Sequence, residues 1–211
     1  MSKALFLFVT FFGLNAAAQS SANTLKTTTK AVAAPSDSSV HVIPTVGLAV
    51  MGLKTDSSSI NPDNGVTAGG LVELGNGLAT GQTGVLYNQF GIQQNSRQAN
   101  LNYLAIPVMG KLNFMGNPEK TFFLKAGVMP SFLVGSTLNT PRGSISGGRV
   151  GATPFDIPVV IGLGGAIPVG PTVSLVIEAN YVRSLVNIND KGTTNAKNEG
   201  LLIGSGLSIA L

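Results

Sequence analysis

The chain has 211 residues, of which 10% are charged and 44% hydrophobic, whereas an ordinary soluble domain has roughly 25% charged residues. After the N-terminal segment, no apolar run approaches the ~20 residues that a membrane-spanning helix needs. A net charge of +4 without a basic run argues against nucleic acid as a partner, and the lack of cysteine excludes disulfides and thiolate chemistry. A membrane-like composition without such helices favours the other spanning structure, a closed β-barrel.

The N-terminal segment has the pattern of a secretory signal peptide. Lys3 supplies the positive charge, residues 4–14 the apolar segment, and Ala16-Ala17-Ala18 the small residues of a cleavage site. We therefore predict a signal peptide over residues 1–18 and export from the cytoplasm.

The next segment, residues 19–39, is rich in Ser, Thr, Ala and Lys. Its apolar residues recur with the period of neither a helix nor a strand, so we predict a flexible lead-in. Residues 40–211 are expected to form the barrel domain, because apolar residues there alternate with small or polar ones, the period of a β-strand. Eight strands are predicted, at 41–55, 65–75, 78–93, 101–114, 120–138, 155–169, 172–188 and 200–211.

The last predicted strand shows the alternation most clearly. Leu201, Ile203 and Leu207 share one apolar face, while the other face carries small residues such as Gly204 and Gly206. An apolar outer face is typical of a strand exposed to lipid. The small inner face indicates that larger side chains of neighbouring strands fill a narrow lumen, so we predict a plugged barrel.

The connections between strands are predicted to alternate in length. Asn76-Gly77 is a strong signal for a type I′ hairpin turn, which needs positive φ at both residues. Short turns are predicted at 76–77, 115–119 and 170–171, and longer polar loops at 56–64, 94–100, 139–154 and 189–198. Outer-membrane barrels sort their connections in this way. The sequence therefore predicts an all-β fold, an eight-stranded antiparallel up-and-down transmembrane β-barrel.

Five charged residues are predicted to face the lumen: Glu73, Lys111, Lys125, Asp156 and Glu178. They are candidates for a binding site, but the interior of an eight-stranded barrel is just wide enough to pack side chains. Buried charges persist when they are paired, so we favour a structural network of ion pairs. An open pore is not expected, because channels need about sixteen strands.

Catalytic residues and metal ligands are not predicted. The only histidine, His41, stands at the entrance to the first strand, and we expect it to be solvated and without the serine and aspartate of a hydrolase. The glycine-rich run at 162–165 resembles a phosphate loop, but it lies inside a predicted strand with no helix after it. It is interpreted as a site of tight packing, and no cofactor is expected.

Several short motifs resemble the PorT-like outer-membrane β-barrel family. They are Tyr103-Leu104-Ala105-Ile106-Pro107 followed by Lys111, A-G-V-M-P-S-F-L at 126–133, Phe155-Asp156, G-L-G-G at 162–165, and N-Y…L-V-N-I at 180–188. The resemblance extends from about residue 46 to the end. It implies an eight-stranded outer-membrane barrel, in a family mostly of unassigned function, and an accessory role in protein secretion across the outer membrane.

The function expected from these observations is that of a non-enzymatic barrel in the outer membrane of a Gram-negative bacterium, with a structural or surface-interaction role exerted through its outer loops. Its expected partners are outer-membrane lipid, the barrel assembly machinery, and an extracellular or secretion partner. Two alternatives stay open. One is the accessory secretion component, and the other is a soluble lipocalin-like barrel for a small apolar ligand, which would require polar outer faces.

Overall fold

The computed structural model describes residues 40–55, 59–94, 97–140, 143–146, 153–188 and 195–211. The predicted signal peptide and lead-in lie outside these ranges. The described residues contain twelve β-strands, and none of them forms a helix of the length and apolarity needed to cross a bilayer.

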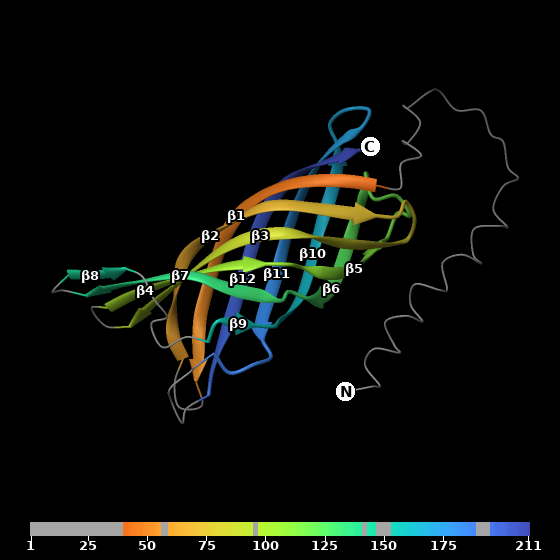
Figure 1. The fold of residues 1–211 in the computed structure, drawn as a ribbon. Helices are drawn as coiled ribbons and strands as arrows, with labels where there is room; N and C mark the ends of the chain where they lie inside the picture. Colours follow the sequence, from red (N-terminus) through yellow and green to blue (C-terminus); the bar gives the residue numbers. More distant parts are fainter. Residues whose placement is uncertain (1–39, 56–58, 95–96, 141–142, 147–152, 189–194) are drawn as a thin grey trace, which may run out of the picture. The chain divides into compact units, whose positions relative to one another are not determined.

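In the part of the chain that the structure describes, the strands follow one another without an intervening helix (Figure 1). They are β1 (Val40–Thr55), β2 (Ser59–Leu74), β3 (Ala79–Gln94), β4 (Arg97–Ala105), β5 (Val108–Asn113), β6 (Thr121–Val128), β7 (Ser131–Thr140), β8 (Gly143–Ser146), β9 (Phe155–Asp156), β10 (Pro158–Pro168), β11 (Val173–Ser184) and β12 (Ala196–Ala210).

Eight of these strands close into a ring. Hydrogen bonds connect β2, β1, β12, β11, β10, β6, β5 and β3 in this order, and the pairing of β3 with β2 completes the circle. Every pairing in the ring is antiparallel. Closure leaves the strands of the ring without a free edge, which a spanning sheet requires in lipid. The predicted eight-stranded antiparallel barrel is confirmed.

Two predicted strands are each interrupted at a proline. The stretch predicted at 101–114 divides into β4 and β5 around Ile106-Pro107, and that at 120–138 into β6 and β7 around Met129-Pro130. Proline has no N–H to donate to a ladder, but the neighbouring residues keep the connection: Ile106 N donates to Pro130 O at 2.8 Å. Past these breaks β4 pairs with β7 and β7 with β8, and the three strands extend beyond the ring (Figure 1).

The predicted loops at 56–64 and 94–100 are wrong, because most of their residues belong to strands. Pairing continues to Lys54 opposite Ser59 and to Gln94 opposite Arg97. The turn-forming sequence N-P-D-N lies inside β2, where the register shifts between Asp63 and Thr67. Such a bulge accommodates an extra residue and a proline without ending the ladder. Strands also reach into the predicted loops at 139–154 and 189–198, as β8 and the start of β12.

The predicted two-residue turn at Asn76-Gly77 is also wrong. The connection occupies residues 75–78, and positive φ occurs at Gly75, with φ of 110°. Gly77 does not have the positive φ that a type I′ turn requires. The turns predicted at 115–119 and 170–171 lie within the connections 114–120 and 169–172.

The predicted faces are confirmed on the described strands. The outer wall carries large apolar side chains from every strand of the ring, with exposed fractions of 62% for Val46, 68% for Phe122 and 61% for Leu163. The inner face packs a single large cluster that includes Met51, Phe90 and Tyr103. A lipocalin-like barrel would show the opposite polarity, so the outer wall of the described strands argues against a soluble protein.

Candidate functional site

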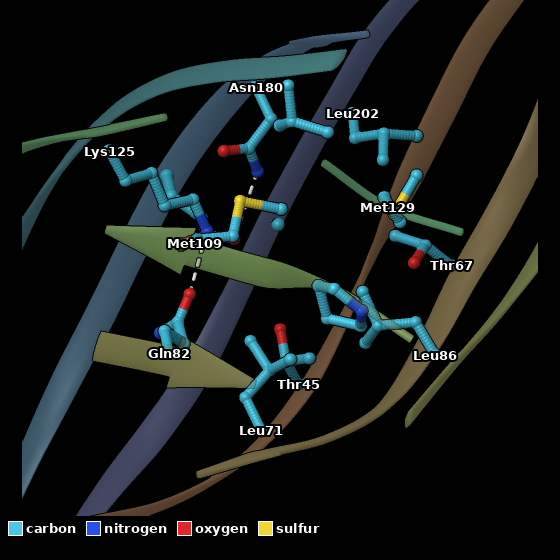
Figure 2. A pocket seen from close by; sticks show the side chains of 14 residues that line it. Thr45, Thr67, Leu71, Gln82, Leu86, Met109, Lys125, Met129, Asn180 and Leu202 are labelled. Carbon is cyan, nitrogen blue, oxygen red and sulfur yellow. Dashed lines mark hydrogen bonds and ion pairs between the residues drawn. The ribbon is translucent and has the colours of Figure 1, made fainter. Parts of the chain in front are cut away.

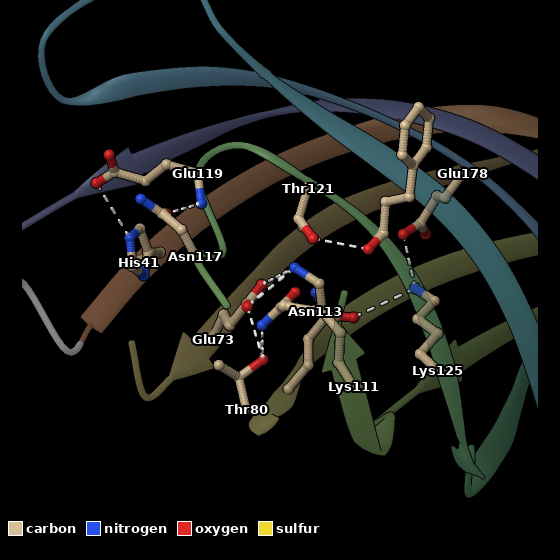
Figure 3. A network of polar contacts seen from close by, with 12 residues as sticks. His41, Glu73, Thr80, Lys111, Asn113, Asn117, Glu119, Thr121, Lys125 and Glu178 are labelled. Atoms are coloured by element: carbon tan, nitrogen blue, oxygen red, sulfur yellow. Dashed lines mark hydrogen bonds and ion pairs between the residues drawn. The ribbon is translucent and has the colours of Figure 1, made fainter. Parts of the chain in front are cut away.

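The first polar cluster of the lumen lies near the end that carries the connections 75–78 and 114–120 (Figure 3). Lys111 Nζ donates to both carboxylate oxygens of Glu73, at 2.9 and 2.8 Å. The Thr80 hydroxyl donates to Glu73 Oε1 at 2.7 Å, and the ammonium of Lys111 lies 4.3 Å from the centroid of the Phe123 ring. Both charged side chains are almost completely buried. The carboxylate and the ammonium therefore compensate each other, with additional polar and aromatic contacts.

A second ion pair lies beside the first. Lys125 Nζ is 2.7 Å from Glu178 Oε2 and 3.2 Å from Gln82 Oε1. The other carboxylate oxygen of Glu178 accepts a hydrogen bond from the Asn180 side-chain amide at 2.9 Å. Lys111 and Lys125 stand directly opposite each other in the β5–β6 register. Two cations so placed would repel each other, and each is matched by its own carboxylate.

Asp156 lies apart from these pairs, near the opposite end of the barrel. Its Oδ2 accepts hydrogen bonds from Ser184 Oγ at 2.6 Å and from Asn198 Nδ2 at 3.0 Å. No cation among the described residues forms an ion pair with it. The five predicted lumen charges thus all point inward, but the structure brings four of them together. It leaves Asp156 in a separate cluster, hydrogen bonded to the uncharged side chains of Ser184 and Asn198.

The space between the two polar regions is filled by apolar side chains. A cavity of about 30 Å³ remains, lined by residues that include Met109, Met129, Val160 and Lys125 (Figure 2). That volume suffices for about two water molecules, whereas small-molecule sites measure roughly 300–1,000 Å³. This cavity is therefore too small to hold an organic ligand.

Glycines allow this dense filling. A Cβ at Gly164 would lie 2.5 Å from Phe123 Cζ, and one at Gly206 would lie 3.0 Å from Ile43 Cγ2. Contacts closer than about 3 Å are not tolerated in a packed interior. We predicted that the inner face of the last strand is small because neighbouring strands fill the space with larger side chains. At Gly206 this is the case, since Ile43 occupies that space. Gly162 to Gly165 lie within β10, where they take part in packing.

His41 is buried, which corrects the expectation that it is solvated. It is the second residue of β1 and 1% exposed, and its Nε2 lies 3.6 Å from Glu119 Oε1 (Figure 3). The side chain points inward, and the connection 114–120 places Glu119 against it. No serine hydroxyl is hydrogen bonded to either ring nitrogen in the described structure. The arrangement lacks the nucleophile–base contact of a hydrolase.

Several residues of the lumen network were not singled out from the sequence. Thr80, Gln82 and Asn113 are buried on inward faces. The alternation of the sequence could have predicted this, because each is a polar residue on the strand face opposite the apolar one. Glu119 had no such signal, since it lies in a turn without periodicity. Among the described residues, no group of three or more His, Cys, Asp or Glu side chains is arranged to hold a metal ion.

Comparison with known proteins agrees with this architecture. The model of the family described as "Outer membrane protein beta-barrel domain" matches residues 17–190. This supports the broad family, and the narrower PorT-like resemblance stays a prediction. No curated protein sequence matches the chain at a significant level.

Two similar solved structures are small outer-membrane β-barrels. Neisserial surface protein A (NspA) is 12% identical, with a TM-score of 0.51, over 81% of this chain and 97% of that one. The attachment invasion locus protein Ail of Yersinia pestis is 15% identical, with a TM-score of 0.48, over 81% of this chain and 99% of that one. At these identities the NspA match supports the fold, and function has to be argued from the chain itself.

Proposed function

Since this chain belongs to the family of the outer membrane protein beta-barrel domain, we propose that it is a non-enzymatic outer-membrane protein with a closed lumen that acts through its outward-facing end. Family membership and the small-barrel fold indicate the outer membrane of a Gram-negative bacterium. The role at that end is interaction with a partner outside the cell.

The observation that carries the proposal is the filled interior. Two carboxylate–ammonium pairs lie toward one end of the lumen, and the hydrogen-bonded cluster of Asp156 lies toward the other. An apolar cluster with a cavity of about 30 Å³ lies between them. Neither transport of a solute nor binding of an internal ligand fits so little space. The surfaces that meet lipid and the aqueous phases are therefore left for function.

The outward-facing end is assigned from the connections. At one end the strands are joined by the turns 75–78, 114–120 and 169–172, and short turns lie on the periplasmic side in this class of barrel. At the other end β4, β7 and β8 continue past the ring (Figure 1). A projecting antiparallel sheet presents backbone groups and side chains to a partner, as in recognition by strand addition.

Labelling of intact cells tests this assignment, because the chain has no cysteine of its own. Ser144 is exposed on β8 and Lys120 is exposed in the turn 114–120. A membrane-impermeant maleimide should label Ser144→Cys in intact cells and Lys120→Cys only after the outer membrane is permeabilised. Labelling of the Lys120 variant alone in intact cells would reverse the orientation and remove the proposed interaction surface.

A second experiment tests the role of the extension. The segment 137–146, which includes the β7–β8 hairpin, is replaced by a short turn, and attachment of whole cells to a gelatin-coated surface is compared with that of cells carrying the complete chain. Loss of attachment with an unchanged amount of folded barrel supports the interaction role. Unchanged attachment, with defective protein secretion in a deletion strain, would favour the accessory secretion role that the PorT-like resemblance implies.

A further inference from the structure

A cluster of charged residues interrupts the apolar outer wall near the outward-facing ends of three neighbouring strands. Lys54 of β1 stands directly opposite Lys197 of β12, and Arg183 of β11 stands opposite Glu199 of β12. These positions share the face of Leu201, which is 46% exposed on the lipid side. The cluster therefore lies on the outside of the barrel and not in its lumen.

The cluster contains more positive than negative charge. Lys54 Nζ and Arg183 Nε are both 3.8 Å from the same oxygen of Glu199, Oε2. That oxygen accepts no hydrogen bond, and the side chains of Lys54 and Arg183 remain 54% and 50% exposed. Among the described residues, Lys197 has no carboxylate within ion-pair distance. The cluster thus holds three cations and one carboxylate, and that carboxylate lies within ion-pair distance of only two of them.

The lysines of the lumen show what a compensated arrangement looks like in this protein. Lys111 and Lys125 are also directly opposed across two strands, and their ammonium groups lie 2.8 and 2.7 Å from separate carboxylates. Like charges placed directly opposite each other in a sheet are destabilising. In the outer pair, Lys54 has only Glu199, at 3.8 Å and shared with Arg183, and Lys197 has no carboxylate within ion-pair distance among the described residues.

The position of the cluster in the bilayer indicates the nature of that partner. On β1 the exposed apolar residues Val46 and Leu48 precede Lys54 on the same face. On β11 the half-exposed ring of Tyr181 borders the cluster, with its hydroxyl beside Glu199 and Arg183. An aromatic residue followed by cations marks the level where acyl chains end and lipid headgroups begin.

We infer that Lys54, Lys197 and Arg183 form an outer-wall site for the phosphate of a lipid in the outer leaflet, the headgroup chemistry of lipopolysaccharide. Guanidinium offers a planar pair of donors that fits phosphate, and the ammonium groups add point charges. The acyl chains of the same molecule would lie along the apolar face formed by residues such as Leu48, Leu201 and Ile203. The site rests on the orientation proposed above but not on the proposed role of the β4–β7–β8 extension, because it works through the outer wall.

Native mass spectrometry of the full-length mature barrel in detergent tests the inference. The probes are bisphosphorylated lipid A, monophosphorylated lipid A and zwitterionic phosphatidylcholine. The wild-type protein should retain lipid A in preference to phosphatidylcholine, with the monophosphorylated form between them. The double substitution K54Q/K197Q should weaken lipid A binding roughly 30-fold, the effect expected for two cations at an anionic membrane surface.

Matched variants separate the site from general effects of charge and folding. K54R/K197R should keep binding, and Lys120→Gln removes an exposed lysine at the opposite end of the barrel and should not change it. In lipid-A-free detergent, K54Q/K197Q should unfold at the same temperature as the wild type or higher, because the opposed lysines repel each other. Millimolar inorganic phosphate should not displace lipid A, because the acyl chains contribute to binding.

Three results would overturn the inference. They are equal binding of lipid A by the wild type and K54Q/K197Q, retention of phosphatidylcholine as strong as that of lipid A, and an equal loss in the Lys120→Gln control. Displacement by inorganic phosphate would identify a free-anion site in place of a lipid site.

Discussion

Two pairs of lysines face each other across neighbouring strands, one pair in the lumen and the other on the outer wall. The inner pair, Lys111 and Lys125, is buried, and each ammonium has its own carboxylate within 2.8 Å. The outer pair, Lys54 and Lys197, lies beside a single carboxylate, which is 3.8 Å from Lys54.

The difference follows from the two environments. A charge buried in the narrow lumen is shielded from bulk solvent and from lipid headgroups, so the protein has to provide the counter-charge. A charge on the outer wall at headgroup level can take its counter-charge from the membrane. The same arrangement of two cations is therefore part of the fold in one place and a candidate contact with lipid in the other.

The largest effect is expected from breaking an inner pair. Glu73→Gln leaves Lys111 buried without a carboxylate, and the free energy of unfolding should fall by about 3–5 kcal/mol, as measured by guanidinium titration of the barrel refolded in lipid vesicles. In the double variant E73Q/K111M no buried charge remains, and most of the loss should be recovered. If the single variant is as stable as the wild type, the pair is not what neutralises this part of the lumen.

A lysine introduced in the middle of the apolar outer wall should destabilise the barrel nearly as much. Val46 lies in the apolar band and is 62% exposed, so Val46→Lys should lower the free energy of unfolding by about 2–4 kcal/mol, the cost of a cation near the middle of the bilayer. Lys54→Val, on the same face of the same strand, should change it by less than about 1 kcal/mol. Equal effects at the two positions in the same vesicle titration would contradict the placement of Lys54 at headgroup level.

An added methyl group should also destabilise the barrel more on the inner face of the wall than on its outer face. A Cβ at Gly162 would meet Asn180 Oδ1 and come within 3.2 Å of Lys125 Cε, whereas a Cβ at Gly165 finds ordinary contacts from 3.6 Å. Gly162→Ala should therefore cost about 1–3 kcal/mol of stability, and Gly165→Ala much less, in parallel unfolding titrations. A larger loss at Gly165 would mean that the inward and outward faces of β10 have been exchanged.

The smallest effect is expected at the outer carboxylate. Glu199 makes two long, partly exposed ion pairs, so Glu199→Gln should change the free energy of unfolding by at most about 1 kcal/mol. The comparison to make is with Glu73→Gln under identical conditions. A loss of similar size at both positions would remove the distinction between the inner and outer pairs.

The sequence was sufficient to predict an eight-stranded barrel and the faces of its strands, but not the bounds of every strand. Alternation with period two is a local property, so it placed Glu73, Lys111 and Lys125 inward before any strand was paired. The contacts of these residues depend on register. That Lys111 meets Glu73 while Asp156 meets Ser184 and Asn198 follows from how distant segments align, and one sequence does not show that alignment.

The errors share the same cause. The polar stretch at 56–64 was predicted to be a loop from its turn residues, but a bulge keeps it in the ladder with β1 and β3. His41 was expected at the solvated entrance of a strand, and the entrance is correct, but a turn from a distant segment brings Glu119 over it. Local chemistry does not reveal what another part of the chain will cover.

The most direct test of the closed barrel is electrical. The mature protein, refolded into planar lipid bilayers, is held at a range of voltages while the current is recorded. The packed lumen predicts a baseline without stable conductance steps, both for the wild type and for the surface variant Lys54→Gln. Reproducible, long-lived steps from the correctly folded wild-type barrel would contradict the plugged lumen and, with it, the proposal that the protein works through its outer surfaces.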